Sequence, residues 1–137
     1  MIDSPAKVFL GGTKGAAWRD QIKPMLKFDY FDPIVPDWTD AARKLELEQK
    51  LICTHRLYVI TKEIKGMYAV AEAVDDSNKR PQQTVFCFIK DGFDTELLRS
   101  IAATSELIRR NGAWVVWSLE EAATRLNSIM QGSGDER

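Results

Sequence analysis

Short apolar runs alternate with amphipathic stretches along the whole chain, and this alternation constrains the fold more than any other feature. The runs at residues 57–60 and 84–89 are apolar at nearly every position instead of at every second one. Strands of that kind are covered on both faces, which is typical of parallel sheets flanked by helices. Repeated strand-helix units join by right-handed crossovers and build one continuous sheet. The chain is therefore expected to form an α/β domain.

Glycines, prolines and helix-capping residues mark the boundaries of the expected elements. Strands are predicted at Lys7–Leu10, Phe28–Phe31, Leu57–Ile60, Thr84–Ile89 and Ala113–Trp117. Helices are predicted to begin near Trp18, after a Thr39 cap, near Met67, after an Asp94 cap and after Ser118, which forms a capping box with Glu121. These elements suit a flavodoxin-like, doubly wound sheet of about five parallel strands with helices on both faces.

The helix expected after Thr39 has an amphipathic pattern. Its apolar positions Ala42, Leu45 and Leu51 recur on one side and are expected to face the core. Its charged residues are expected to face water: Arg43, Lys44, Glu46, Glu48 and Lys50.

Length and composition suit one domain. The chain has 137 residues, of which 45% are hydrophobic, and we expect a domain over residues 1–130 with a flexible, polar tail at 131–137. Lys+Arg 19 and Asp+Glu 20 nearly balance, so no basic field would attract a nucleic acid polymer or an anionic membrane. No apolar stretch approaches the roughly 20 residues that span a bilayer. We therefore expect no membrane association and a cytoplasmic location.

The cysteines and the single histidine have neither metal-ligand spacing nor the pattern of a catalytic triad. Cys53 and Cys87 lie in apolar surroundings, so both are expected to be reduced and buried. The chain has no Gly-x-Ser-x-Gly elbow, which excludes a serine hydrolase of that type. We expect His55 at the surface or at a helix end, and we expect neither a metal nor another cofactor.

Two loops after the first and second strands carry residues suited to a ligand site. Gly11, Gly12 and Thr13 begin a glycine-rich turn that either cradles a small polar or phosphorylated ligand or only turns the chain tightly. Prolines stiffen the backbone around Asp37 and Trp38, which either contact a sugar or a base or merely cap and pack the following helix.

Glu72 lies early in the helix that follows the third strand. An acid in that position either takes part in chemistry or only favours the helix dipole. The first three strands of a doubly wound sheet are neighbours, so the loops that follow them converge at one edge, where ligands bind. This convergence favours a shared cleft that contains Glu72, the glycine-rich turn and the Asp37-Trp38 pair.

Five motifs occur in a fixed order between Lys7 and Phe88. They are Lys7–Thr13, Trp18-Arg19, Tyr30–Trp38, Leu57–Thr61 and Gly66-x-Tyr68-x-x-Ala71-Glu72. Together they resemble the nucleoside 2-deoxyribosyltransferase-like family. The resemblance implies a flavodoxin-like fold and an enzyme that moves the 2-deoxyribosyl group of a deoxynucleoside, or of its monophosphate, to another base or to water.

The resemblance gives Glu72 the role of a nucleophilic glutamate. A carboxylate against C1′ stabilises an oxocarbenium-like transition state or traps it as a glycosyl ester. By its position, Asp37 is the candidate that orients the substrate or handles a proton. The expected substrate-binding residues are Gly11, Gly12, Thr13, Trp38, Gly66 and Tyr68.

The chain departs from the family pattern before the glutamate and after the third strand. It has Gly66-Met67 in place of a Gly-Thr or Gly-Ser pair, and Thr61 near a position where the family has an acid. These differences support a second hypothesis, a module that binds a nucleotide or an ADP-ribose-like compound without turnover. The resemblance also implies a homodimer or larger homo-oligomer, in which Trp114 and Trp117 are either interface or core residues.

Overall fold

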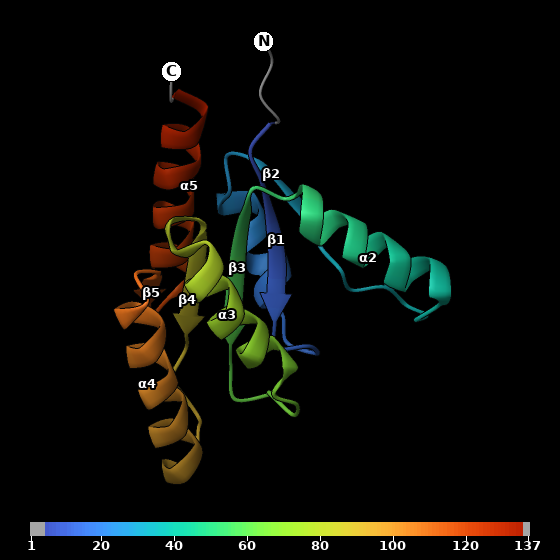
Figure 1. The fold of residues 1–137 in the computed structure, drawn as a ribbon. Helices are drawn as coiled ribbons and strands as arrows, with labels where there is room; N and C mark the ends of the chain where they lie inside the picture. The colour runs from blue at the N-terminus through green and yellow to red at the C-terminus, as the bar shows by residue number, and fades with distance from the viewer. Residues whose placement is uncertain (1–4, 136–137) are drawn as a thin grey trace.

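The computed structural model describes residues 5–135 and contains a five-stranded parallel sheet with the strand order β2-β1-β3-β4-β5. The strands are β1 (Lys7–Gly12), β2 (Asp29–Phe31), β3 (His55–Ile60), β4 (Thr84–Phe88) and β5 (Trp114–Val116). The helices are α1 (Trp18–Ile22), α2 (Asp40–Ile52), α3 (Tyr68–Lys79), α4 (Thr95–Arg110) and α5 (Leu119–Asp135), with short 3-10 turns η1 (Lys23–Met25) and η2 (Pro81–Gln83). Figure 1 shows this arrangement. It confirms the predicted flavodoxin-like, doubly wound fold.

Each face of the sheet has its own apolar core, as the continuously apolar strands require. Successive side chains of a strand point to opposite faces. Leu57 and Val59 therefore pack with α1 and α5, while Tyr58 and Ile60 pack with α3 and α4. Both cores are buried, and the strands are covered on both sides.

Hydrogen bonds at the helix starts confirm the predicted caps. Thr39 Oγ1 accepts a hydrogen bond from the Ala42 amide at 3.1 Å, and Asp94 caps α4 in the same way through the Leu97 amide at 2.9 Å. At α5 the Glu121 amide donates to Ser118 Oγ at 3.1 Å. The Glu121 carboxylate accepts from the amide of residue 117, at 2.7 Å, which is one residue earlier than a standard capping box.

Helix α2 is turned the opposite way from the sequence expectation. Glu46 and Lys50 are half-buried, whereas Leu45 is 45% and Leu51 is 87% exposed. No residue of α2 is fully buried, and Figure 1 shows the helix projecting away from the other elements. The polar side of α2 meets the rest of the chain instead, where Lys50 forms an ion pair with Glu72 of α3.

His55 was expected at the surface or at a helix end, and this prediction is wrong. It is the first residue of β3 and is fully buried, because β3 begins two residues earlier than predicted and pairs there with Val8. The Thr54 hydroxyl lies 2.7 Å from His55 Nδ1. Burial lowers the pKa of His55 to about 4, so the imidazole is neutral near pH 7.

The last helix extends further than the sequence predicts. Helix α5 continues to Asp135, so residues 131–135 are helical where a flexible tail was expected, and residues 136–137 lie outside the described part. Extending a helix that has already formed fixes little additional backbone per hydrogen bond, which explains the difference.

Cys53 and Cys87 are free and buried, as predicted. None of the described helices has the length and apolar character needed to cross a membrane.

The two tryptophans near β5 differ in their surroundings. Trp114 packs in part against the core on the α5 side, whereas Trp117 is 45% exposed, with Lys90 Nζ 4.3 Å from its ring centroid. Trp114 therefore has a packing role within this chain.

Candidate functional site

A hollow of about 600 Å³ opens beside the carboxyl ends of β1 and β3. Its wall comes from β1 and the following loop, the loop after β2, α2, the loop after β3 and the start of α3. Pockets of this size hold small-molecule ligands. The structure brings together here most of the site residues predicted from the sequence: Gly11, Gly12, Thr13, Trp38, Gly66, Tyr68 and Glu72.

Asp37 is exposed and does not belong to the residues that line the hollow. Thr39, and not Asp37, caps α2. The neighbouring Trp38 does line the hollow, with its side chain 56% exposed and Lys14 Nζ 5.7 Å from its ring centroid. The structure therefore separates the two members of the predicted Asp37-Trp38 pair.

Two hydrogen bonds, one between backbone groups and one to a side chain, connect the glycine-rich turn to the end of β3. The Thr13 amide donates to the Val59 carbonyl at 2.9 Å, and Thr13 Oγ1 accepts from the Thr61 amide at 2.9 Å. Gly12 has φ +121°, a backbone conformation that side-chain-bearing residues rarely adopt. The turn is therefore rigid and brings its backbone to the surface of the hollow.

Arg19 of α1 donates hydrogen bonds to backbone carbonyl groups in and before the same turn. Its Nη1 donates to the Thr13 carbonyl at 2.9 Å and its Nε to the Leu10 carbonyl at 3.2 Å. Burial lowers the pKa of Arg19 to about 10, which leaves the guanidinium charged near pH 7. Asp32, whose Oδ1 lies 3.6 Å from Arg19 Nε, partly balances that charge.

Glu72 belongs to the second turn of α3, and its side chain is 13% exposed. Its Oε2 accepts a hydrogen bond from Lys50 Nζ of α2. Burial lowers the pKa of Lys50 from its ordinary value. The arrangement is a half-buried ion pair, one member of which lines the hollow.

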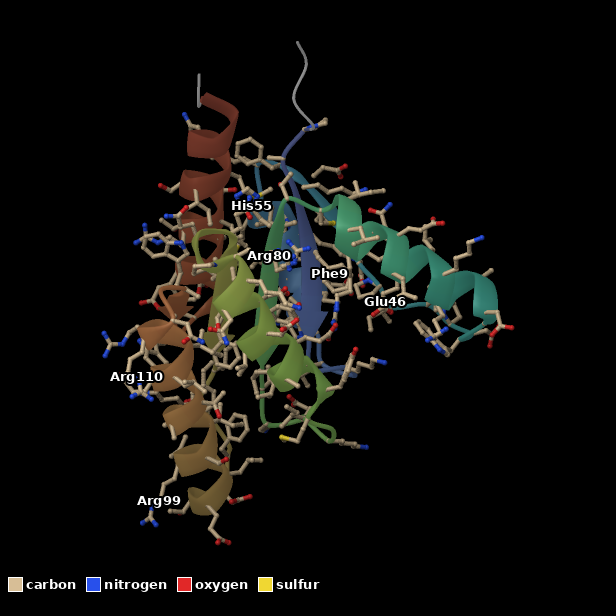
Figure 2. The ribbon with its side chains drawn as sticks, viewed as in Figure 1. Phe9, Glu46, His55, Arg80, Arg99 and Arg110 are labelled. Carbon is tan, nitrogen blue, oxygen red and sulfur yellow. The ribbon has the colours of Figure 1, made fainter. Side chains whose placement is uncertain are left out.

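Sequence reasoning missed two acids in the wall of the hollow. Glu63 follows β3, and Thr61 Oγ1 donates a hydrogen bond to its carboxylate, which lowers the pKa of Glu63. Glu63 could have been identified from the sequence, because it stands two residues after Thr61, near the position where the family that the motifs resemble has an acid. Glu46 was assigned to water with the polar side of α2, but Figure 2 shows it on α2 near Phe9 of β1, and both residues line the hollow.

A buried charge cluster lies one turn further along α3. Asp76 is on the same side of α3 as Glu72, four residues later, and accepts a hydrogen bond from the Tyr58 hydroxyl at 2.6 Å. Arg56 Nε lies 3.3 Å from Asp76 Oδ2, and its guanidinium also donates to the Lys50 carbonyl. The cluster therefore ties the end of α2 to α3 and so positions Lys50 beside Glu72.

Replacing Tyr58 by Phe should reduce the free energy of unfolding by about 2 kcal/mol, because a buried carboxylate loses a hydrogen-bond donor. Burial raises the pKa of the Tyr58 phenol, so the hydroxyl is a protonated donor. Urea unfolding measures the change, and Tyr68→Phe is the control because that side chain is 76% exposed. Equal stability of the two variants would contradict a stabilising role for the Tyr58-Asp76 hydrogen bond.

Within residues 5–135, no group of three or more His, Cys, Asp or Glu side chains is arranged to hold a metal ion. Comparisons of the chain with protein-family models, with curated proteins and with solved structures give no match.

Proposed function

We propose that the chain cleaves the N-glycosidic bond of a deoxynucleoside or a deoxynucleoside monophosphate, with Glu72 as the nucleophile. The observation that carries the proposal is a half-buried carboxylate in the wall of a hollow of about 600 Å³ at the carboxyl edge of a parallel sheet. The motifs that resemble nucleoside 2-deoxyribosyltransferases contribute much of that wall.

The reaction uses the two carboxylate oxygens of Glu72 differently. Oε2 is engaged by Lys50, so we assign Oε1 to the anomeric carbon. As the bond between Oε1 and C1′ forms, the C1′–N bond breaks, and the departing base keeps the electron pair and takes a proton from solvent. Water or a nitrogen of another base then attacks C1′ and releases its proton to solvent as the C1′–Oε1 bond breaks, which restores the carboxylate and completes hydrolysis or transfer.

The remaining wall suits a nucleoside. Gly11 and Gly12 allow close approach to the backbone, while the aromatic rings of Trp38 and Tyr68 offer faces for a base. We assign the Glu63 carboxylate to accept a hydrogen bond from a sugar hydroxyl. Asp37, the sequence candidate for handling a proton, has no part in this proposal because it lies outside the wall.

Lys50 is a positioning residue in this proposal, since its ion pair places a positive charge beside the Glu72 carboxylate. Replacing Lys50 by Met removes that charge, and a carboxyl group without a neighbouring cation takes up a proton at higher pH. The loss of kcat/KM with falling pH should therefore begin at a higher pH than in the unaltered chain. The pH dependence of kcat/KM measures this shift, and Lys79→Met, which alters an exposed ion pair with Asp75, should leave it in place. If the Lys50 variant lost kcat/KM over the same low-pH range as the unaltered chain, the positioning role of Lys50 would be contradicted.

The ion pair also favours a second candidate function, which is binding without turnover. A carboxylate that is neutralised by a lysine is a weaker nucleophile, so the same hollow would hold a nucleotide or an ADP-ribose-like compound intact. Incubation with deoxynucleosides, their 5′-monophosphates and ADP-ribose separates the two functions. The enzyme releases free base, detected by chromatography, whereas a binding module shows a raised melting temperature while mass spectrometry finds the compound unchanged.

A further inference from the structure

Among the described residues, three acids line the hollow, and one of them has no partner. The Glu72 carboxylate pairs with Lys50, and the Glu63 carboxylate accepts a hydrogen bond from Thr61. Glu46 is half-buried, yet in the described part of the chain no group donates a hydrogen bond to its carboxylate or forms an ion pair with it. A partly buried carboxylate without a donor is unfavourable. A ligand that carries hydrogen-bond donors would remove that cost.

The position of Glu46 relative to Glu72 suits the base of a bound nucleoside. Glu46 lies four residues before Lys50 on the same side of α2, which is about 6 Å along the helix axis. Lys50 Nζ pairs with Glu72 and lies 5.7 Å from the ring centroid of Phe9, which Figure 2 shows near Glu46. A sugar at Glu72 would therefore leave its base beside the apolar ring of Phe9 and within reach of the Glu46 carboxylate.

The chemistry of a carboxylate limits which base it can recognise. An ionised carboxylate only accepts hydrogen bonds, and its two oxygens match two adjacent N–H groups on one edge of a ligand. Guanine has such an edge, formed by N1–H and the 2-amino group. Adenine and cytosine place their amino group beside a ring nitrogen that is an acceptor, and thymine has one N–H between two carbonyl groups. Among these four bases, guanine is the best match to Glu46.

We propose that the Glu46 carboxylate accepts two hydrogen bonds from a guanine base, so that 2′-deoxyguanosine or its 5′-monophosphate is the preferred substrate. The inference rests on the proposed function, because the sugar at Glu72 sets the position of the base. Glu46 is a specificity-determining residue in this arrangement and takes no part in breaking the C1′–N bond.

The first test changes the ligand. Isothermal titration calorimetry measures the dissociation constants of 2′-deoxyguanosine, 2′-deoxyinosine and 2′-deoxyadenosine with the full chain carrying Glu72→Gln, in which each nucleoside stays intact. Deoxyinosine has the N1–H group but no 2-amino group, so it should bind about tenfold more weakly than deoxyguanosine. Deoxyadenosine lacks the pair of adjacent donors and should bind about thirtyfold more weakly. Equal dissociation constants for deoxyguanosine and deoxyadenosine would overturn the proposal.

The second test changes the protein, again with Glu72→Gln present. Glu46→Gln keeps the shape of the side chain but places an amide NH₂ group against one donor of guanine. It should weaken deoxyguanosine binding by about thirtyfold and change deoxyadenosine binding by less than about threefold. The control is Glu48→Gln, which alters an exposed acid of α2 outside the wall of the hollow and should change neither constant. Unchanged deoxyguanosine binding, or an equal loss for both nucleosides, would contradict the role of Glu46.

Base release by the unaltered chain separates this inference from the proposed reaction. Selective binding of deoxyguanosine without release of guanine would contradict the reaction and support the role of Glu46. Release of base from deoxyguanosine and deoxyadenosine with equal kcat/KM would support the reaction and overturn the role of Glu46. If none of the three nucleosides bound, both would be overturned.

Discussion

Replacing Glu72 by Gln should slow the release of free base from a deoxynucleoside by about three orders of magnitude or more, which is the usual loss when an enzymatic nucleophile is removed. Glutamine keeps the shape of the side chain, and its amide oxygen still accepts a hydrogen bond from Lys50. The fold should therefore stay intact while the charge that stabilises the oxocarbenium-like transition state is lost. Chromatography of the free base, in a time course at saturating substrate, measures the effect.

The matched control is Glu106→Gln, because Glu106 is an exposed acid of α4 that pairs with Arg109 away from the hollow. The control should release base at the rate of the unaltered chain. Equal melting temperatures for the two variants would exclude unfolding as the cause of a difference in their rates of base release. Base release by Glu72→Gln within tenfold of the unaltered rate would contradict a nucleophilic role.

Replacing Gly12 by Ala should destabilise the fold strongly, with a loss of about 3–5 kcal/mol in the free energy of unfolding. A Cβ at this position would lie 2.2 Å from the Val59 carbonyl oxygen, and the backbone has φ +121°. The unfavourable conformation alone costs about 1–3 kcal/mol. Relief of the clash would separate β1 from β3 and disturb the Thr13 hydrogen bonds to the end of β3.

Urea unfolding followed by circular dichroism measures this loss, which is comparable with the whole stability of many domains. The control is Gly66→Ala, because a Cβ there would meet no atom within 4 Å. We expect the control to change the free energy of unfolding by less than about 1 kcal/mol. If Gly12→Ala were as stable as Gly66→Ala, that result would contradict close packing of the turn against β3.

The fold was predictable because the sheet leaves a strong local signal. Continuously apolar strands such as residues 84–88 and separate capping residues such as Thr39 and Asp94 each specify an element within a few positions. The convergence of the glycine-rich turn, Trp38 and Glu72 follows from strand order, since loops after neighbouring parallel strands share one edge. The sheet order confirms that part of the reasoning.

The orientation of α2 was not predictable from its periodicity. The pattern of Leu45 and Leu51 identifies an apolar side, but it does not say whether that side meets the chain's own core. In the structure the polar side of α2 faces the chain, where Lys50 pairs with Glu72, a residue 22 positions further along. The same change of orientation brings Glu46 to the hollow. The hydrophobic pattern of one helix predicts neither the orientation of α2 nor the position of Glu46 at the hollow.

Single polar residues were the least predictable. His55 was expected at the surface or at a helix end because it precedes the apolar run, yet β3 pairs with β1 from His55 onward and buries it. Asp37 and Trp38 are adjacent in the chain, but only Trp38 lines the hollow. Glu63 is placed by the turn after β3, whose path depends on Thr61. In each case the side chain's position depends on tertiary contacts that local sequence does not encode.

The proposed reaction requires a covalent bond between the Glu72 carboxylate and the anomeric carbon of the sugar. Its most direct test is mass spectrometry of the protein after brief incubation with a deoxynucleoside monophosphate and acid quenching, followed by peptide mapping. We predict free base in solution and one 5-phospho-2-deoxyribosyl group attached to the α3 peptide at Glu72, absent from Glu72→Gln. Unmodified protein with an intact nucleotide, or a 5-phospho-2-deoxyribosyl group at another residue, would contradict the nucleophilic role of Glu72.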